Sequence, residues 1–254
     1  MRAALNCRQG GRGGGRRGGG GSNPLAAAEA SINSIANLVI NLDDRDLATG
    51  ALTHWIDRKN AYDFAGTVTK DASGVTGNGA TDILTSTAAI SQISGASAVT
   101  IIAAMLDTSA GTCAILEHSP NAPTNVGSFL WYTDTVGARF HNLAKGNVGN
   151  SDYYATDTLA TAAVWTGQSD FTLASAESAV MRKNGSAVST TLTANGNNTN
   201  TFGSYALSLF ARVGPSLPWA GSFRKILLFS RALTAGEMLQ AERAVGIITG
   251  ITVA

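Results

Sequence analysis

Short segments that alternate between apolar and polar residues fill most of the chain after residue 37. Alternation with a period of two predicts β-strands with one buried face. Clusters of Gly, Asn and Pro separate these segments, and Asn184-Gly185 is the dipeptide preferred in a two-residue type I′ hairpin turn. Many short strands at this spacing predict a sandwich or a barrel. We expect strands at 38–43, 81–86, 98–106, 113–119, 128–134, 138–144, 171–178, 178–183, 187–193, 205–213 and 223–233.

A short helix is predicted before the first strand, at residues 23–37. Asn23 is a suitable N-cap, and Pro24 suits the first helical position. The helix either caps the open end of the β-domain or docks on a partner. Its apolar stripe would consist of Leu25, Ile32 and Ile35.

A second helix is predicted at residues 234–246. Thr234 is the expected N-cap, and Glu237 three residues later completes a capping box. Gly246 suits the C-terminal end. The residues expected to face inward are Leu239, Ala241 and Val245.

Composition and charge divide the chain into three zones. Residues 1–22 form a Gly/Arg-rich arm, residues 23–37 the short helix and linker, and residues 38–254 the β-domain. Charged residues make up only 14% of the chain, so Thr, Ser, Asn and Gly must supply most of the polar surface. The arm contains no acidic residue, which predicts that it binds an acidic partner. Its arginines are Arg2, Arg8, Arg12, Arg16 and Arg17.

Several classes of protein are not expected from this sequence. Two cysteines, Cys7 and Cys113, cannot form a disulfide framework, and the three histidines lack the spacing of zinc ligands. The longest apolar runs, such as residues 97–106, are too short to span a membrane. The first residues lack the apolar core of a secretory signal. We therefore expect neither a membrane segment nor a secretory signal.

The stretch 219–246 resembles the last strand and helix of laminin-G-like domains, in the concanavalin A-like lectin/glucanase superfamily. The shared pattern is a Gly, a hydrophobic strand, an R-x-L-[ST]-x-x-E turn and a short helix. The matching positions are Gly221, Ile226, Leu228, Phe229, Arg231, Leu233, Thr234 and Glu237. The resemblance covers about residues 37–250 and implies an all-β fold, a two-sheet antiparallel jelly-roll sandwich.

Residues 37–66 resemble the opening of the same family, a strand followed by a Trp-x-Asp turn at Trp55 and Asp57. The usual D-x-S-G-N-G after the tryptophan is replaced by DRKNAYDF, so this motif is only partly present. In the C-terminal pattern, Arg231 would hydrogen-bond carbonyls at the sheet edge and Leu233 would plug the end of the core. The helix would cover the open mouth of the sandwich.

The glucanases of this superfamily cleave sugars with a pair of carboxylates on one strand. A retaining mechanism needs them about 5–5.5 Å apart, so acidic residues would alternate along a strand. This sequence has no such run, because Glu117 and Glu177 each stand alone. The DDRD stretch at 43–46 is predicted to be a turn with Asx hydrogen bonds and an ion pair to Arg45. We expect no catalytic residues and no enzymatic activity.

Some laminin-G-like domains bind Ca²⁺ through Asp side chains at the rim of the sandwich. The resemblance makes Asp43, Asp44, Asp46 and Asp57 the candidate ligands in this chain. No loop has the acid-rich spacing of an EF-hand. We therefore expect no metal and no other cofactor, with Ca²⁺ as the open alternative.

Glycan-binding sites use exposed aromatic rings beside Asn or Asp, and two segments supply such rings. Trp131 and Tyr132 are adjacent in a predicted strand, so they point to opposite faces and at most one belongs to a site. Tyr153 and Tyr154 lie in a stretch predicted to be a polar loop, where aromatic residues favour contact with a ligand. The alternative is that these rings pack loops onto the sheet. The candidate glycan contacts are Trp131, Tyr153 and Tyr154.

The arm could bind nucleic acid or another protein subunit. RNA-binding Arg/Gly segments carry aromatic residues that stack on bases, and this arm has none. Five charges alone give weak, salt-sensitive binding to phosphates, so we do not expect a nucleic-acid partner. We favour an assembly arm whose arginines bind carboxylates on a neighbouring subunit.

A basic Gly-rich arm, a small helix and a laminin-G-like sandwich together resemble tailed-phage virion proteins. That resemblance implies a non-enzymatic capsid decoration protein, head fibre or tail appendage, assembled in the host cytoplasm and located in the virion. Other virion subunits would bind the arm, and the protein would be a homo-oligomer. One alternative is a carbohydrate-binding adhesin that contacts host-surface glycans. A glycoside hydrolase or lyase is the third hypothesis, and it would need a carboxylate pair.

Overall fold

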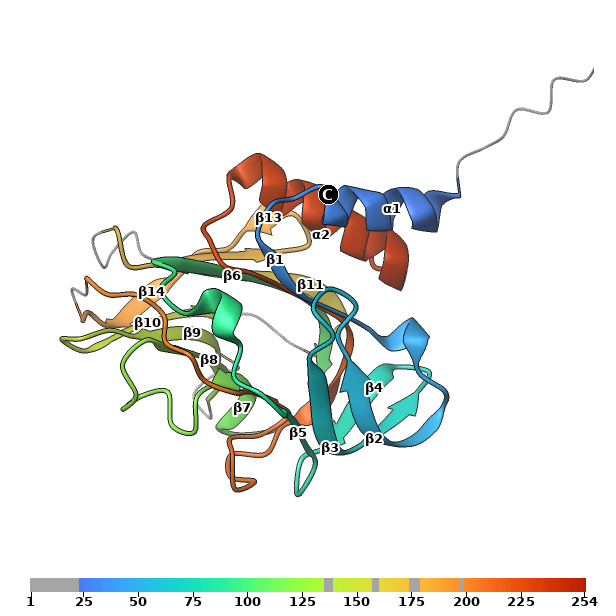
Figure 1. Cartoon of the computed structure of the whole chain (residues 1–254), viewed down its shortest axis with the longest axis horizontal. Helices are drawn as coiled ribbons and strands as arrows, with labels where there is room; N and C mark the ends of the chain where they lie inside the picture. Colours follow the sequence, from blue (N-terminus) through green and yellow to red (C-terminus); the bar gives the residue numbers. More distant parts are fainter. Residues whose placement is uncertain (1–22, 135–138, 157–159, 174–178, 197–198) are drawn as a thin grey trace, which may run out of the picture.

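The strands of the chain form one hydrogen-bonded path that folds over on itself as an antiparallel sandwich (Figure 1). The computed structural model describes residues 23–134, 139–156, 160–173, 179–196 and 199–254. This architecture confirms the predicted all-β sandwich with one helix near each end of the chain. The strands are β1 (Leu38–Asp43), β2 (Gly50–Ile56), β3 (Asp63–Asp71), β4 (Gly74–Asn78), β5 (Ile83–Ser86), β6 (Ala98–Asp107), β7 (Cys113–His118), β8 (Ser128–Thr133), β9 (Arg139–Lys145), β10 (Asn150–Thr156), β11 (Ala163–Asp170), β12 (Ala179–Lys183), β13 (Ser186–Ala187), β14 (Thr191–Ala194), β15 (Leu207–Leu209) and β16 (Ala220–Phe229).

The path divides into two sheets that face each other. The helix-covered sheet has the order β13-β12-β11-β6-β16, with β1 and β4 both beside β16. The second sheet has the order β5-β15-β7-β8-β9-β10-β14. Strand β3 joins them, because residues 69–71 pair with β4 and residues 64–67 pair with β5, while β2 pairs along its other edge. Two one-turn 3-10 helices, η1 (Asp44–Asp46) and η2 (Ser91–Ile93), lie in the connections.

Two α-helices, α1 (Pro24–Asn33) and α2 (Ala235–Thr249), lie together over one sheet as a third layer (Figure 1). Strand β6 shows why the sequence demands this layer. Ile101 and Ala103 pack in the sandwich core, whereas Ile102 and Ala104 pack beneath the helices. A strand buried on both faces reads as a nearly continuous apolar run, as residues 98–106 do.

The predicted position of the C-terminal helix is wrong. Instead of closing the mouth of the sandwich, α2 covers the outer face of β6, β11 and β16, where Ile102, Val164 and Leu227 would otherwise meet water. Leu233 packs in this helix–sheet cluster rather than plugging the end of the core. Arg231 hydrogen-bonds a carbonyl as expected, since its Nε donates to the oxygen of Ala36 at 3.3 Å.

The N-terminal helix is shorter than predicted. Asn23 caps it, because its Oδ1 accepts a hydrogen bond from the N–H of Leu25 at 3.0 Å, and the helix ends at residue 33. Ile32 and Ile35 are buried against α2 and the sheet, but the side chain of Leu25 is 40% exposed. The predicted apolar stripe is therefore only partly a core contact.

The capping box of α2 is present as predicted. The Thr234 Oγ1 accepts a hydrogen bond from the Glu237 N–H at 3.3 Å, and the Glu237 carboxylate accepts one from the Thr234 N–H at 2.9 Å. Glu237 also accepts hydrogen bonds from the Arg231 guanidinium. The hydrogen bonds from Arg231 and from the Thr234 backbone lower the pKa of Glu237 to about 2.

The predicted end of α2 at Gly246 is wrong, because the helix runs three residues further. Its C-cap is Gly250, whose φ of 76° is a left-handed value that favours glycine. Gly246 serves close packing instead, since an added Cβ would lie 2.8 Å from Cγ2 of Val253. Of the residues expected to face inward, Ala241 and Val245 are buried in the helix–sheet cluster, whereas Leu239 is half-buried and lines the outer seam between the two helices.

Replacing the N-cap, Thr234→Ala, is expected to lower the free energy of unfolding by about 1 kcal/mol. The loss arises because the Glu237 N–H no longer has its acceptor. Since the pKa of Glu237 lies near 2, below its ordinary value of 4.5, the contribution of its carboxylate is present above pH 4.5 and is lost as the pH falls towards 2. Urea unfolding at pH 7 measures the change. Thr234→Ser, which keeps the hydroxyl, is the control, and equal losses in both variants would exclude a capping role.

Local alternation located most strands but not all. The hairpin at Asn184-Gly185 is confirmed, since both residues have positive φ (48° and 89°) and the turn joins β12 to β13. The predicted strand 171–178 is wrong where it is described, because residues 171–173 form a turn after β11. The segment 187–193 divides between β13 and β14, and the segment 205–213 contains only the short β15. Strands β2, β3, β4 and β11 were not predicted, because Gly, Thr and Ala interrupt their alternation. Strand β10 was not predicted because it begins with three polar residues in a row, Asn150 to Asp152.

The sandwich core is built around large aromatic side chains. The Trp131 indole on β8 reaches across to Gly167 on β11 and is fully buried. Its Nε1 donates a hydrogen bond to Oδ1 of Asn142 at 3.1 Å, which fixes the ring. In the described part of the chain, no helix has the length and apolar character needed to cross a membrane.

Candidate functional site

Three side-chain rings lie in a row on the outward face of the second sheet. Tyr132 on β8 is the register partner of His141 on β9, and His141 is the register partner of Tyr154 on β10. The Tyr132 and His141 rings stack with centroids 4.1 Å apart, and the His141 and Tyr154 centroids are 5.3 Å apart. We call this row the ring ladder (Tyr132, His141 and Tyr154). Cross-strand register, rather than a loop, therefore positions all three rings.

Charged groups surround the ring ladder. The Arg139 guanidinium lies over the Tyr154 ring, 4.6 Å from its centroid. His141 lies between two carboxylates, with Nδ1 3.1 Å from Oδ1 of Asp152 and Nε2 3.2 Å from Oδ2 of Asp134. Charged side chains seldom leave water unless they are paired. On this half-buried face the carboxylates of Asp134 and Asp152 both have His141 as a partner.

Asp152 is the centre of the hydrogen bonds beneath the ring ladder. Its Oδ2 accepts from the Tyr132 hydroxyl at 2.8 Å and from the Thr193 hydroxyl at 2.7 Å. Burial by itself raises the pKa of Asp152, but the hydrogen bond and charge of His141 and the two hydroxyl donors together bring it below its ordinary value. Burial raises the pKa of Tyr132, and the neighbouring Asp152 carboxylate raises it further. The carboxylate is therefore ionised and the phenol protonated at neutral pH.

The structure brings one of the three predicted glycan contacts to this face. Trp131 is fully buried and Tyr153 is 3% exposed, because both point into the sandwich core. Neither ring offers a surface to a ligand. Tyr154 is half-buried on the outward face. The expected polar loop around it is wrong, since residues 150–156 form the strand β10.

The candidate Trp131 is the inward member of its pair, and the polar partners of the ring ladder were not among the predicted site residues. Alternation correctly separated Trp131 from Tyr132, and the outward residue of the pair is Tyr132. Asp152 and Tyr154 share a face because they are two residues apart on β10. That i, i+2 spacing was the available signal, and it was lost when the segment was taken for a loop. His141, which no sequence motif singled out, is 3% exposed.

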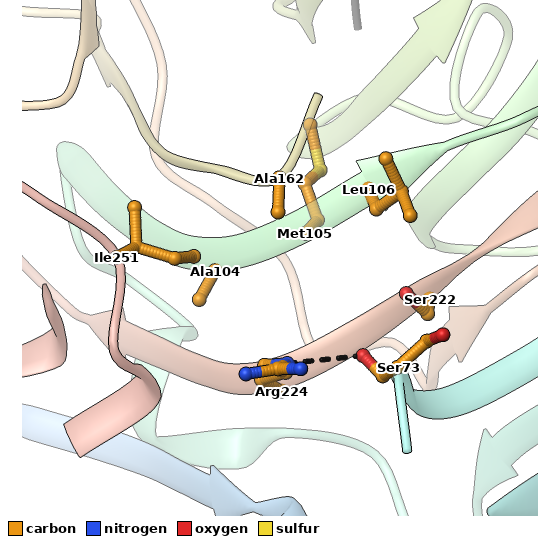
Figure 2. Close-up of a pocket in the computed structure, with 8 residues that line it drawn as sticks. All are labelled: Ser73, Ala104, Met105, Leu106, Ala162, Ser222, Arg224 and Ile251. Atoms are coloured by element: carbon orange, nitrogen blue, oxygen red, sulfur yellow. Dashed lines mark hydrogen bonds between the residues drawn. The ribbon is translucent and has the colours of Figure 1, made fainter. Parts of the chain in front are cut away.

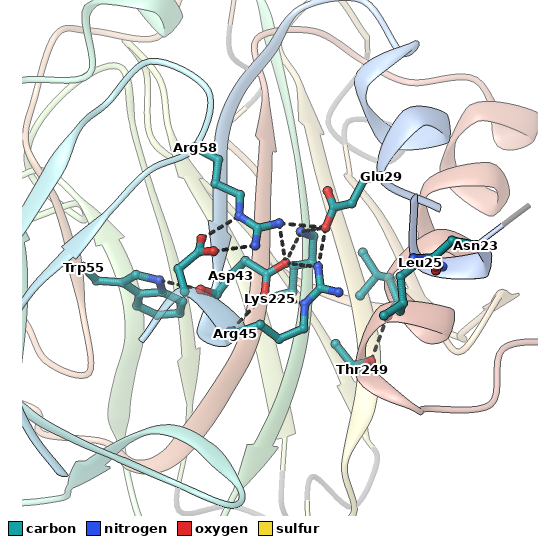
Figure 3. Close-up of polar contacts among 11 residues, drawn as sticks. Asn23, Leu25, Glu29, Asp43, Arg45, Trp55, Arg58, Lys225 and Thr249 are labelled. Atoms are coloured by element: carbon teal, nitrogen blue, oxygen red, sulfur yellow. Dashed lines mark hydrogen bonds and ion pairs between the residues drawn. The ribbon is translucent and has the colours of Figure 1, made fainter. Parts of the chain in front are cut away.

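A second group of charges includes Asp43 and Asp46, two of the aspartates that were candidates for the alternative of a Ca²⁺ site. This ion-pair cluster lies at the junction of α1, η1 and β16 (Figure 3). The Asp43 carboxylate receives Lys225 Nζ at 2.7 Å, and Arg45 binds it through both its backbone N–H and its guanidinium. The Asx turn and the Arg45 ion pair expected at 43–46 are thereby confirmed. The cluster consists of Glu29, Asp43, Arg45, Asp46, Arg58 and Lys225.

Through Glu29, the ion-pair cluster links helix α1 to the sandwich. Its Oε1 lies 2.8 Å from Arg58 Nη1 and 3.1 Å from Lys225 Nζ (Figure 3). Burial by itself raises the pKa of Asp43, but the hydrogen bonds of Arg45 and the charge of Lys225 lower it well below its ordinary value. The cluster contains three acidic and three basic side chains, so its charges balance. Glu29 is the member on α1, and its ion pairs hold this helix on the sheet.

The other candidate calcium ligands also have partners within the fold. Asp44 lies 2.9 Å from Lys70 Nζ, and Asp57 accepts backbone hydrogen bonds from Asn41 and Asn60. Within the described ranges, no three His, Cys, Asp or Glu side chains are grouped so that they could hold a metal ion.

Two isolated glutamates were considered for catalysis. Glu117 is fully buried, and its carboxylate accepts hydrogen bonds from the Ala122 N–H at 2.5 Å and from Arg212 Nε at 2.8 Å. It therefore secures two loops to β7. Glu177 lies outside the described residues, as do all five arginines of the arm.

A hollow of about 90 Å³ lies beside the C-terminal end of α2 (Figure 2). Arg224 is its charged residue, and the guanidinium donates to the carbonyls of Ser73 at 3.2 Å, Ala72 at 2.9 Å and Thr249 at 2.8 Å. A cation at a helix C-terminus interacts favourably with the helix dipole. Arg224 thus joins the β3–β4 turn to α2, which is a role in folding.

Comparisons with known proteins support the fold. No protein-family model matches the chain, and no curated protein matches it. Trypanosoma rangeli sialidase in complex with sialic acid aligns with a TM-score of 0.60 and 15% identity, over 89% of this chain and 38% of that one. Botulinum neurotoxin type C, whose cell entry depends on interaction with two ganglioside molecules, aligns with a TM-score of 0.57 and 9% identity, over 86% and 53%.

A third solved structure has the same kind of likeness. The binding domain of botulinum neurotoxin DC, in complex with rat synaptotagmin II, aligns with a TM-score of 0.56 and 8% identity, over 83% of this chain and 52% of that one. At these identities the three alignments show a shared sandwich fold. The chain spans 38% to 53% of the length of these structures.

Proposed function

We propose that this sandwich binds carbohydrate on the outward face of β8, β9 and β10. The observation that carries the proposal is the ring ladder, in which cross-strand register places the half-buried Tyr132 and Tyr154 on either side of the buried His141 ring, next to charged groups. A sugar has apolar C–H faces and a polar hydroxyl rim. Aromatic surfaces beside a few fixed polar groups complement both parts.

The fold of the molecule favours this face. The helices cover the outer face of the other sheet. On the outer face of the second sheet, Leu130 and Leu143 are buried with Ala122 from a loop, and the half-buried Tyr132 packs beside that cluster. Two of the aligned structures concern sialic acid and gangliosides, which is compatible with a sugar ligand at the level of the fold. Arg139 and Thr193, at the edges of the ring ladder, would supply hydrogen bonds to hydroxyl groups.

The proposed role is binding and not catalysis. Asp152 already accepts hydrogen bonds from Tyr132 and Thr193 and contacts His141. Its lowered pKa keeps it ionised, so it suits the orientation of a ring and not the donation of a proton. The virion location, the laminin-G-like assignment and the anchoring arm stay predictions of the sequence. A glycan-binding sandwich held in a particle by its arm would satisfy both leading hypotheses.

Loss of the Tyr154 ring, in Tyr154→Ala, is expected to weaken glycan binding about tenfold, which corresponds to about 1.4 kcal/mol. A glycan array with the whole chain identifies the ligand, and titration calorimetry then gives the two dissociation constants. Tyr154→Phe keeps the ring and is expected to bind within about twofold of the parent chain.

A variant on the helical layer, Ile247→Ser, controls for general effects, because this exposed residue belongs to α2, which packs on the other sheet. It should leave binding unchanged. The proposal is wrong if the folded chain binds no glycan on the array, or if Tyr154→Ala and Ile247→Ser bind the ligand equally well.

A further inference from the structure

The outer seam between α1 and α2 is an apolar groove. It has a volume of about 540 Å³, and its walls come from residues spaced three and four apart on each helix. Ala28 and Ala244 also belong to the buried cluster between the helices and the sheet, so the bottom of the groove reaches that cluster. Its apolar lining includes Ala27, Ala28, Leu239, Ala244 and Ile247.

The groove exposes a large apolar side chain. Ile247 on α2, one of the lining residues, is 54% exposed. A smaller hollow of about 360 Å³ continues past Arg243 and Ile247 towards the C-terminal residues. Contiguous apolar surface of this kind marks a place where another segment of protein packs.

The chain itself contains a segment suited to this groove. Residues 1–8, MRAALNCR, place Met1, Ala4 and Leu5 at the i, i+3, i+4 spacing of one helical face. Residues 10–21 consist only of Gly and Arg, which makes a tether without apolar side chains. The tether enters the described structure at Asn23, and Pro24 is itself part of the groove lining.

The length of the tether matches the groove. A Gly-rich chain of the 14 residues 9–22 has a root-mean-square span of roughly 20 Å. The groove extends along residues 236–247 of α2, which is about 17 Å at the rise of an α-helix. The span of the tether is therefore close to the length of the groove. At such a match the tethered segment has an effective concentration at the groove in the millimolar range, about the highest that a flexible linker provides.

We propose that residues 1–8 dock their apolar side chains into the α1–α2 groove of the same chain. A copy of this segment from a second molecule would have to compete with the millimolar effective concentration of the tethered one. Docking covers Ile247. The arginines reach water along the rim because their aliphatic stems extend past the apolar contact. The arm thus has two parts, an apolar plug and a cationic tether that stays available to an acidic partner.

Cys7 makes the proposal testable by disulfide trapping. Arg243→Cys introduces a thiol at the exposed rim of the groove. Val213→Cys introduces an exposed thiol in the β15–β16 loop. This loop lies on the far side of the sandwich from the helices (Figure 1). Both variants of the full chain are equilibrated at low micromolar concentration in a glutathione redox buffer. Peptide mass spectrometry then identifies the link to Cys7. The other native cysteine, Cys113, is buried.

We expect Cys7 to form a within-chain disulfide with the cysteine at position 243. The effective concentration of the Cys7 thiol should be at least about tenfold higher at position 243 than at position 213. Adding Ile247→Glu to Arg243→Cys places a charge in the groove and should reduce trapping to the level at position 213. Equal trapping at the two positions overturns the proposal. A disulfide that forms mainly between chains overturns it as well, because the occupant is then a second copy.

Discussion

The Gly167→Ala variant is expected to unfold with a free energy about 3 kcal/mol lower than that of the parent chain. An alanine Cβ at this position would lie 2.7 Å from Cζ2 and from Nε1 of Trp131, on the facing sheet. The indole cannot retreat, because it is fully buried and its Nε1 is hydrogen-bonded to Asn142. Urea denaturation followed by Trp fluorescence and circular dichroism measures the loss.

A double-mutant cycle distinguishes this steric clash from a general defect of β11. Trp131→Phe removes the indole atoms that approach Gly167, so Gly167→Ala should cost about 1–2 kcal/mol less in that background. Gly236→Ala is the matched control, because an added Cβ there meets nothing within 4 Å and alanine favours a helix. Additive losses in the cycle would show that the two sheets do not meet at this point.

Removing the charge of Lys225 is the second large effect that we expect. Lys225→Met keeps most of the side-chain volume, but Asp43 then remains buried without the ammonium group 2.7 Å away. Breaking a buried ion pair by removing one partner costs about 3 kcal/mol. The loss should appear as a lower free energy of unfolding at pH 7, measured by urea denaturation. Lys59→Met, at an exposed lysine, is the control and should change little.

The destabilisation caused by Lys225→Met should depend on pH. Because the pKa of Asp43 is below its ordinary value of 3.8 in the folded chain, its ion pairs stabilise the fold above that pH and are lost as the pH falls further. Lys225 is one cause of the lowered pKa. The gap between the parent chain and Lys225→Met should therefore narrow below about pH 4. A gap that is constant from pH 7 to pH 3 would mean that the loss comes from packing alone.

The ring ladder shows which features of the site the alternation of apolar and polar residues can predict. The sequence predicts that Trp131 and Tyr132 point to opposite faces, and they do. It does not say which face is inward, because that depends on the sheet that packs opposite β8. The register that sets His141 between Tyr132 and Tyr154 likewise comes from the pairing of β8, β9 and β10. A search for exposed aromatic residues in loops could not find a site built across strands.

Features held by neighbours in the chain were determined by the sequence itself. The capping box at Thr234 and Glu237 and the hairpin at Asn184-Gly185 need only local hydrogen bonds and local backbone angles, so residue type and spacing suffice to predict them. The strand at 98–106 was predicted from its apolar side chains. A run with Thr100 as its one polar residue is typical of a strand buried on both faces, but the run does not say which segment covers it.

The tertiary structure alone decided which distant residues share a face or a charge. The turn between Asp43 and Arg45 is local and was predicted, whereas Lys225, 182 residues from Asp43, enters the cluster only because β16 pairs with β1. The same holds for α2 over β6 and for the ring ladder on the second sheet. Strand order and register are set by the combined burial of many side chains, and no short segment of the sequence contains that information.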